Sequence, residues 1–275
     1  MNRERALDAS WKAWLKENLK RGCSPRELLE TLTKHGFSLS SIRQNMGDAF
    51  PSETPLAGSE PLLPPRLVRN PPAKLRKIET DKLDLYTLDD FLSAKECDRL
   101  VAVINLHLRP STVTIESTEK TFRTSRTCEL SLLRSSPLAL STDAKIAKTL
   151  GIRLEYSEGI QAQRYDVGQQ FKGHTDYFEP GTAEFEKFGG ERGNRTWTFM
   201  VYLNDGMQGG GTKFFAIDHT FQPKKGQAVL WNNLNPDRTP NAATLHSGEP
   251  VLAGHKIIIT KWFRELGWGP MFYDD

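Results

Sequence analysis

The stretch that decides the fold reads Gln163-Arg-Tyr165-Asp-Val-Gly168-Gln-Gln-Phe-Lys-Gly-His174-Thr-Asp176-Tyr-Phe. Side chains two residues apart in a strand point to the same face of a sheet. His174 and Asp176 can therefore aim an imidazole and a carboxylate at one point. A His-x-Asp pair by itself also occurs by chance in surface turns, so a second feature must decide between a metal site and a polar turn.

The second feature is His246, which lies 70 residues after Asp176 in Thr244-Leu-His246-Ser-Gly. Two imidazoles and one carboxylate from separate segments form the facial triad that binds Fe(II) and leaves coordination positions open. The sequence thus predicts an iron site made of His174, Asp176 and His246. Two open positions would take a bidentate 2-oxo acid and the third would take O₂.

Lys256 begins the alternating strand Lys256-Ile-Ile-Ile-Thr-Lys-Trp262-Phe. A cation on an apolar face is costly to bury without a partner, and the distal carboxylate of 2-oxoglutarate would be such a partner. The alternative is a lysine at a strand end whose ammonium group reaches water. The neighbouring triad favours the first interpretation.

The remaining pattern predicts a mainly β domain with flanking helices. Ser93-Ala-Lys-Glu96 caps a helix, and a second helix fits residues 143–150. Strand-like runs separated by Gly, Pro and Asn turns favour a double-sheet fold. These runs cover residues 121–130, 160–165, 197–203, 227–231, 244–247 and 256–263.

The N-terminal quarter has a different character. Helical spacing of apolar residues predicts two or three short helices in residues 1–50, the second opened by Ser24-Pro25-Arg26-Glu27. Seven of the 16 prolines lie in residues 51–72, which predicts an extended linker over residues 51–77. The expected organisation is a small helical module, this linker, and a catalytic domain over residues 78–275.

Composition bounds the class of protein. No apolar run approaches the roughly 18 residues needed to cross a bilayer, and no secretion signal is visible. Three separated cysteines, Cys23, Cys97 and Cys128, fit no disulfide framework, which favours a cytoplasmic location. Residues 1–77 carry 14 basic and 8 acidic side chains, but no aromatic interleaving, which favours a solvated helical surface over nucleic-acid binding. A partner for this module stays unknown.

From about residue 84 to residue 265 the chain resembles the catalytic domain of the prolyl 4-hydroxylases, within the 2-oxoglutarate/Fe(II) dioxygenase superfamily. The resemblance rests on an ordered series of motifs in register. They are Arg123-Thr-Ser125, Gln161-Ala-Gln-Arg-Tyr165-Asp-Val-Gly168-Gln, Arg195-Thr-Trp-Thr198-Phe-Met-Val-Tyr202-Leu, Gly209-Gly210-Gly-Thr212-Lys-Phe214, Pro223-Lys-Lys-Gly226-Gln-Ala-Val-Leu-Trp231, and Lys256 ten residues after His246.

The resemblance implies a distorted double-stranded β-helix, or jelly roll, with iron ligands His174, Asp176 and His246. It implies that Lys256 forms a salt bridge with the distal carboxylate of 2-oxoglutarate, to which Tyr165 and Thr198 would hydrogen-bond. The implied reaction converts 2-oxoglutarate to succinate and CO₂ and hydroxylates a C–H bond, most simply of a prolyl residue, with ascorbate in support. His35, His219 and His255 are not expected to be ligands.

The sequence departs from the collagen-type enzymes at Glu249 and at Lys172-Gly173. These departures weigh against a collagen substrate and leave the iron chemistry untouched. Residues 179–194 contain glycines and charges that fit a lid or a plain loop. Two other functions stay open: an oxygenase of another side chain, free amino acid or small metabolite, and a non-catalytic binding or sensing module.

Overall fold

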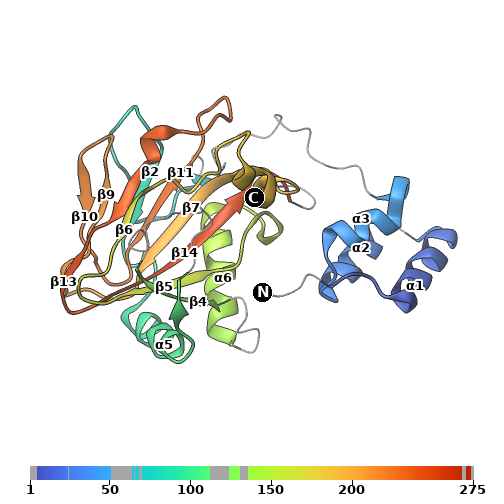
Figure 1. Cartoon of the computed structure of the whole chain (residues 1–275), viewed down its shortest axis with the longest axis horizontal. Coiled ribbons are helices and arrows are strands. Elements are labelled where there is room, and N and C mark those ends of the chain that lie inside the picture. Colours follow the sequence, from blue (N-terminus) through green and yellow to red (C-terminus); the bar gives the residue numbers. More distant parts are fainter. Residues whose placement is uncertain are drawn as a thin grey trace. The chain divides into compact units, whose positions relative to one another are not determined.

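The computed structural model describes residues 5–23, 25–50, 64, 66–67, 70–111, 124–130, 136–267 and 271–273. The contacts within the chain divide it into two units, Met1–Thr54 and Pro55–Asp275 (Figure 1). Each unit is described by itself.

The first unit is a small helical bundle, as predicted. It contains α1 (Ala9–Lys20), α2 (Pro25–Lys34), α3 (Leu39–Met46) and the 3₁₀ turn η1 (Gly47–Ala49). Asp8 and Ser38 cap the first and third helices by accepting from the backbone N–H groups of Trp11 and Ser41. The predicted cap Ser24 lies outside the described residues. Buried apolar side chains form the core: Leu7, Leu15, Leu28, Leu29, Leu32, Phe37, Ile42 and Met46.

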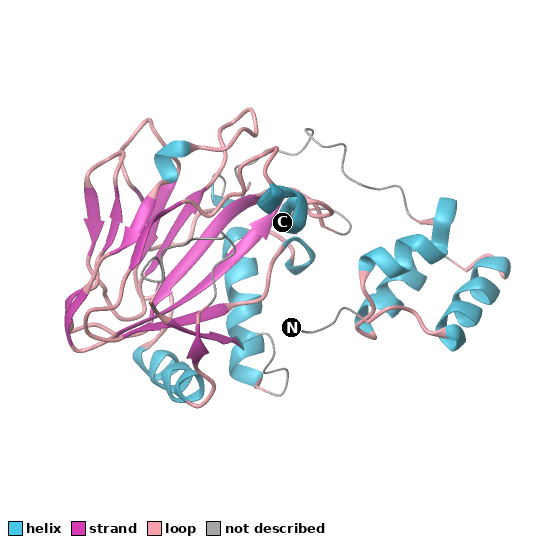
Figure 2. Ribbon diagram, viewed as in Figure 1, coloured by secondary structure: helices cyan, strands magenta, loops and turns pink. Residues whose placement is uncertain are grey.

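The second unit is built on three antiparallel sheets (Figure 2). The eight-stranded sheet has the order β1 (Leu75–Lys77), β2 (Leu85–Leu88), β11 (Ala228–Asn232), β7 (Arg195–Tyr202), β14 (Lys256–Arg264), β5 (Gln161–Tyr165), β4 (Arg126–Glu129), β3 (Arg109–Pro110). The four-stranded sheet has the order β10 (His219–Phe221), β9 (Thr212–Phe214), β12 (His246–Gly248), β6 (Phe171–His174). A two-stranded sheet pairs β13 (Val251–Ala253) with β8 (Gln208–Gly209).

Both faces of the large sheet are covered, which is why every residue of β14 is buried. On one face lie α5 (Ala94–Asn105) and α6 (Pro137–Leu150), whose apolar residues share a core with β7 and β14. Ser93 and Glu96 form the predicted capping box of α5. The other face packs on the four-stranded sheet through a second core that includes Tyr202, Phe214 and Trp231. This is the predicted jelly roll with flanking helices.

Three boundaries differ from prediction. The predicted linker ends too late, because β1 at Leu75–Lys77 pairs with β2 and Leu67 is buried in the core of the second unit. The last proline of the run is Pro72, so nothing removes the backbone donors that β1 needs. Helix α6 begins at Pro137 rather than at residue 143, because Ser136 caps it. Residues 242–244 form the 3₁₀ turn η5 (Ala242–Thr244), and strand β12 starts only at His246.

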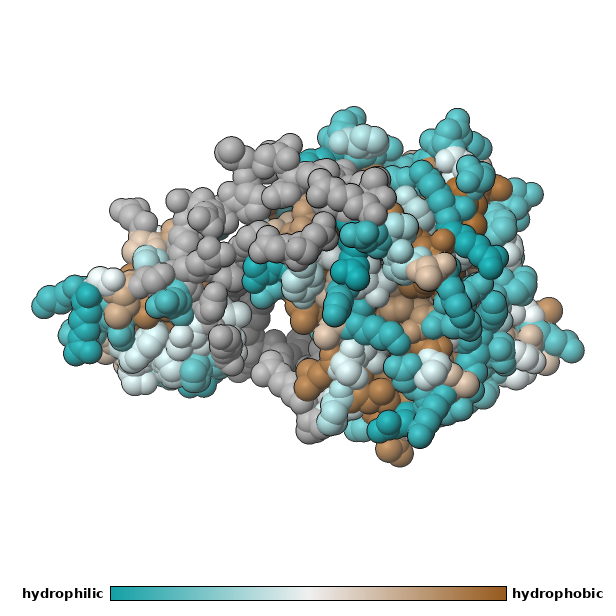
Figure 3. Space-filling model, turned by 180° about the vertical axis from the view of Figure 1, so that it is seen from behind, coloured by the Kyte–Doolittle hydropathy of each residue, from teal (hydrophilic) through white to brown (hydrophobic). Residues whose placement is uncertain are grey.

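The outer surface of the second unit is mostly hydrophilic on the face shown in Figure 3, with apolar side chains in patches between charged ones. Across the part of the chain that the structure describes, no helix combines the length and the apolar character that crossing a membrane requires.

Candidate metal centre

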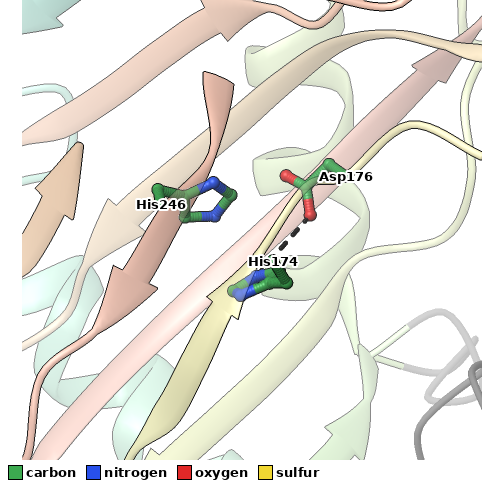
Figure 4. Close-up of side chains that lie close together, drawn as sticks. All are labelled: His174, Asp176 and His246. Atoms are coloured by element: carbon green, nitrogen blue, oxygen red, sulfur yellow. Dashed lines mark ion pairs between the residues drawn. The ribbon is translucent and has the colours of Figure 1, made fainter. Parts of the chain in front are cut away.

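Three predicted ligands converge at one end of the four-stranded sheet. His174 is the last residue of β6 and His246 is the first of β12, and the two are direct partners across the antiparallel pair. Asp176 follows two residues after His174 and turns its carboxylate toward both rings (Figure 4). One ligand atom from each residue lies within 4.8 Å of the others, and His174 Nε2 is 4.0 Å from Asp176 Oδ1. Among the described residues no other group of three potential ligands of this kind is found.

The route to this convergence differs from the predicted one. Strand β6 ends at His174, so Asp176 does not lie in a strand. The alternation of side chains along a strand therefore does not explain why its carboxylate faces the histidines. The bend after the strand brings its carboxylate to the histidines instead. Antiparallel pairing with β12 supplies the second histidine, which no local pattern specifies.

Backbone carbonyls fix the orientation of both imidazoles. His174 Nδ1 is 2.8 Å from the carbonyl of Lys172, and His246 Nδ1 is 2.9 Å from that of Thr244. A carbonyl can only accept, so Nδ1 of each ring is the donor, and the neutral form of each ring would offer the lone pair of Nε2 to a metal. The Phe171 ring stacks on His174, with centroids 3.5 Å apart, and Phe214 and Trp231 pack against His246.

The Asp176 carboxylate is buried and hydrogen-bonded. The Thr198 hydroxyl donates to Asp176 Oδ2 over 2.7 Å, which leaves Oδ1 on the side of the histidines. Burial alone would raise the pKa of Asp176, but His246, His174, Arg195 and the Thr198 hydroxyl together hold this pKa below its ordinary value. Two imidazole nitrogens and one carboxylate oxygen with ordered outer contacts match the donor set that Fe(II) takes.

Lys256 lies on the inner face of the large sheet and is only 1% exposed. Its ammonium group has no hydrogen bond or ion pair with any described residue, and it sits 4.7 Å from the centre of the Tyr165 ring. Burial lowers the pKa of Lys256 from 10.5 to about 7, against a small opposing effect of Glu249. A buried cation without a partner is what a pocket for an anion requires.

Two glycines leave room beside this cation. A Cβ on Gly248 would lie 3.4 Å from Lys256 Nζ, and one on Gly210 would lie 3.6 Å from Lys256 Cδ. Gly210 also has φ +70°, a conformation that side chains disfavour. Thr212 is the strand partner of Gly248, and its hydroxyl accepts a 2.7 Å hydrogen bond from Tyr202. Thr212 therefore belongs to the surroundings of Lys256, a position that its Gly-Gly-x-Thr-x-Phe motif alone does not indicate.

Tyr165 and Thr198, which were predicted to bind the same carboxylate as Lys256, lie in different parts of the sheet. Tyr165 pairs directly with Lys256 across β5 and β14, and its hydroxyl donates to Gln163. Thr198 on β7 is instead the strand partner of Trp262 on β14. Trp262 lies six residues after Lys256, which corresponds to roughly 20 Å along the strand. In this structure the Thr198 hydroxyl donates to Asp176, and the contact of Thr198 with the distal carboxylate of 2-oxoglutarate stays a prediction.

The segment at 179–194 has anchored ends. Asn194 uses both atoms of its amide to hold the backbone N–H and carbonyl of Phe178, each over 2.8 Å. Arg264 donates to the carbonyls of Phe188 and Gly193 and pairs with Glu158, which also holds Arg195. The middle of the segment forms the π-helix η4 (Phe185–Gly189). Movement of this segment as a lid stays a prediction.

Three other histidines have no predicted role as ligands. His219 is exposed on β10, His35 is exposed in the first unit, and His255 lies beside Lys256 with its pKa lowered by burial. None of them belongs to the cluster of His174, Asp176 and His246.

Comparisons with known proteins agree with this geometry. Residues 160–264 match the family model described as the 2OG-Fe(II) oxygenase superfamily. The chain is 31% identical over 201 residues to probable prolyl 4-hydroxylase 3 of Arabidopsis thaliana, covering 65% of this chain and 68% of that protein. It is 31% identical over 194 residues to prolyl 4-hydroxylase subunit alpha-1 of Gallus gallus, covering 69% of this chain and 37% of that subunit.

Among solved structures, the fold resembles that of the viral collagen prolyl hydroxylase vCPH from Paramecium Bursaria Chlorella virus-1. The TM-score is 0.50 at 26% identity, over 66% of this chain and 88% of the viral chain. The fold and the site thus define a 2-oxoglutarate/Fe(II) oxygenase, a class whose cofactors are Fe(II), 2-oxoglutarate and O₂. Within that class the chain belongs to the prolyl 4-hydroxylase family.

Proposed function

We propose that this protein hydroxylates a prolyl residue of a peptide or protein, coupled to decarboxylation of 2-oxoglutarate. The observation that carries the proposal is the pairing of two sites in one jelly-roll interior. One is a His-Asp-His cluster whose ligand atoms lie within 4.8 Å, and the other is a buried lysine without a partner among the described residues. The family relationship supports the same chemistry.

His174, Asp176 and His246 would hold the iron through the two Nε2 atoms and Asp176 Oδ1. When bound, Fe(II) with 2-oxoglutarate and O₂ supplies oxidation of a C–H bond together with release of succinate and CO₂. The chain fixes the three ligands before metal arrives, because both imidazoles and the carboxylate are already hydrogen-bonded on their far sides.

Lys256 would pair with the distal carboxylate of 2-oxoglutarate. A carboxylate restores the charge partner that the buried ammonium group lacks, so binding favours the protonated lysine. Tyr165 lies under the ammonium group, and its hydroxyl would exchange its bond to Gln163 for one to the same carboxylate. Thr212 is the strand partner of Gly248, which lies beside Lys256, and its hydroxyl would donate to this carboxylate as well. Tyr165 belongs to the same apolar core as Tyr202, Phe214 and Val251, and this core limits the access of water to the ammonium group.

A peptide or protein substrate is supported by the relationship to the prolyl 4-hydroxylases.

The test is incubation of the purified protein with Fe(II), 2-oxoglutarate and proline-containing peptides. We expect equal amounts of succinate and of peptide that has gained one oxygen atom on proline, both lost when a chelator removes iron. Oxidation of a free amino acid, a metabolite or another side chain instead would support the runner-up function. Binding of Fe(II) and 2-oxoglutarate without any turnover would support a sensing module.

Three further parts of the function are proposals. Ascorbate would sustain turnover by re-reducing iron, and its omission should shorten the linear phase of the reaction. A cytoplasmic location is supported by Cys23, Cys97 and Cys128, all of them free thiols. The helical module of residues 1–50 would bind an as yet unidentified partner.

A further inference from the structure

Three buried side chains form a continuous series of hydrogen bonds that ends at the Asp176 carboxylate. The Trp231 indole Nε1 donates to Asn233 Oδ1 over 3.0 Å, and Asn233 Nδ2 donates to Thr198 Oγ1 over 2.8 Å. Thr198 then donates to Asp176 Oδ2 over 2.7 Å. Trp231, Asn233 and Thr198 are each at most 1% exposed, so water does not compete for these bonds.

The indole at one end of this hydrogen-bond series and the carboxylate at the other fix which group donates at each step. An indole N–H can only donate, so the oxygen of the Asn233 amide must face Trp231 and its NH₂ group must face Thr198. The Thr198 oxygen accepts that bond, and its one hydrogen is left for the carboxylate, which can only accept. Reversing any one member would leave a buried donor facing a donor or an acceptor facing an acceptor.

The backbone of Asn233 is held as firmly as its side chain. Its N–H donates to the carbonyl of Thr196 over 2.7 Å, and its own carbonyl accepts from Asn241 over 2.9 Å. Trp231 is fixed in turn by packing of its ring against His246 and Phe214. The Asn233 amide is therefore held in a fixed position. It connects Trp231, which packs against His246, to the Asp176 carboxylate through Thr198.

We propose that Asn233, oriented by Trp231, is a positioning residue that sets the rotation of the Asp176 carboxylate through Thr198. The consequence is that Oδ2 is occupied by a protein donor and Oδ1 is presented to the metal. This inference rests on the proposed function, because it assigns a role toward a metal that Asp176 would bind. Asn233 itself touches neither metal nor substrate.

The test measures Mn(II) affinity of the full-length protein by electron paramagnetic resonance, without cosubstrate or turnover. Asn233→Asp keeps the size of the side chain and the acceptor for Trp231, but it removes the donor to Thr198. The Thr198 hydrogen can then turn to the newly introduced carboxylate and leave Asp176. We expect the Mn(II) dissociation constant to rise by about 10- to 100-fold, the usual cost of losing an outer contact of a metal ligand.

Asn232→Asp is the matched control. Asn232 is also buried and lies one residue away. Among the described residues its side chain makes one hydrogen bond, in which its oxygen accepts from the backbone N–H of Leu234, and the substituted side chain retains this acceptor. A second pair keeps the test valid if Asn233→Asp does not fold. Thr198→Val removes the donor to Asp176 and should weaken Mn(II) binding as much, whereas Thr198→Ser keeps the donor and should restore it.

The outcomes separate the two proposals. Unchanged Mn(II) affinity in both Asn233→Asp and Thr198→Val, with folded proteins and tight binding by the wild type, would overturn the positioning role alone. Equal weakening in Asn232→Asp would also overturn it, because the effect would then be a general result of a buried charge. Failure of the wild-type protein to bind Mn(II) would overturn the proposed function itself.

Discussion

The metal-ligand cluster and the surroundings of Lys256 differ in how far the protein itself satisfies their polar groups. At the metal end, every ligand is already satisfied on its far side by a carbonyl or a hydroxyl. At the proposed anion site, Lys256 is 1% exposed, and its ammonium group lies over the Tyr165 ring and forms no hydrogen bond or ion pair with a described residue. The protein thus orients the three candidate metal ligands by itself. Burial of the unpaired Lys256 ammonium group is unfavourable, and an anionic ligand would offset this free energy.

A second buried lysine on the same strand makes the contrast sharper. Lys261 is also 1% exposed, but its ammonium group pairs with Asp143 over 2.5 Å and donates to the carbonyl of Glu158 over 2.8 Å. It is a structural cation, on the face of β14 opposite to Lys256. Burial is therefore common to both lysines, and the lack of a partner among the described residues distinguishes Lys256, for which we propose ligand binding.

The largest expected effect is at the metal end. His174→Ala removes one of three ligands and should bring iron-dependent succinate formation below detection. His219→Ala is the matched control, because His219 is exposed on β10 and outside the cluster. Continued turnover of the His174→Ala protein would contradict the proposed iron site.

Lys256→Met should separate function from stability. Loss of the charge partner should weaken 2-oxoglutarate binding by about 2–5 kcal/mol, which is roughly 30-fold to several thousand-fold. The same change should stabilise the ligand-free protein at pH 7 by on the order of 4 kcal/mol, since the folded-state pKa of Lys256 lies at about 7 instead of 10.5. Isothermal titration calorimetry and thermal unfolding would measure the two effects.

Lys261→Met is the control for that experiment, and its effect on stability should have the opposite sign. It leaves Asp143 and the Glu158 carbonyl without their donor, so the free energy of unfolding should fall. If both methionine variants destabilise the protein equally, the distinction between the two lysines is wrong.

The pH dependence follows from the lowered pKa of Lys256. Between about pH 7 and 10.5 the unfolded lysine holds a proton that the folded one has lost, so stability of the ligand-free protein rises with pH over this window. Binding of 2-oxoglutarate needs the ammonium form, so its dissociation constant should rise above pH 7 by up to about tenfold per pH unit. Calorimetry in buffers of different ionisation enthalpy should show proton uptake on binding, and its absence would contradict this mechanism.

The smallest expected effect distinguishes two threonines. Thr212→Val should raise the KM for 2-oxoglutarate by about three- to tenfold, the value of one hydrogen bond, and leave Mn(II) affinity unchanged. Thr198→Val should weaken Mn(II) binding instead. If Thr212→Val lowers metal affinity, the two ends of the site are not separate.

Much of the fold could be predicted because its signals are local. The capping box at Ser93 set the start of α5, and the alternating run from Lys256 located β14. Predictions failed where a signal was absent or ambiguous. A short strand after the proline run, at Leu75–Lys77, has no pattern of its own and exists only because β2 pairs with it.

The sequence by itself determined the candidate residues: His174, His246 and Lys256 lie at strand ends, Asp176 follows β6 by two residues, and their spacing is written in the chain. Only the tertiary structure decided what each of them contacts. Strand register and packing bring the Thr198 hydroxyl to Asp176, place Thr212 opposite Gly248, which lies beside Lys256, and link Asn233 to Asp176 through Thr198. The physical reason is that register is set by the packing of whole sheets, so one residue's neighbours across a sheet depend on contacts far from it in sequence.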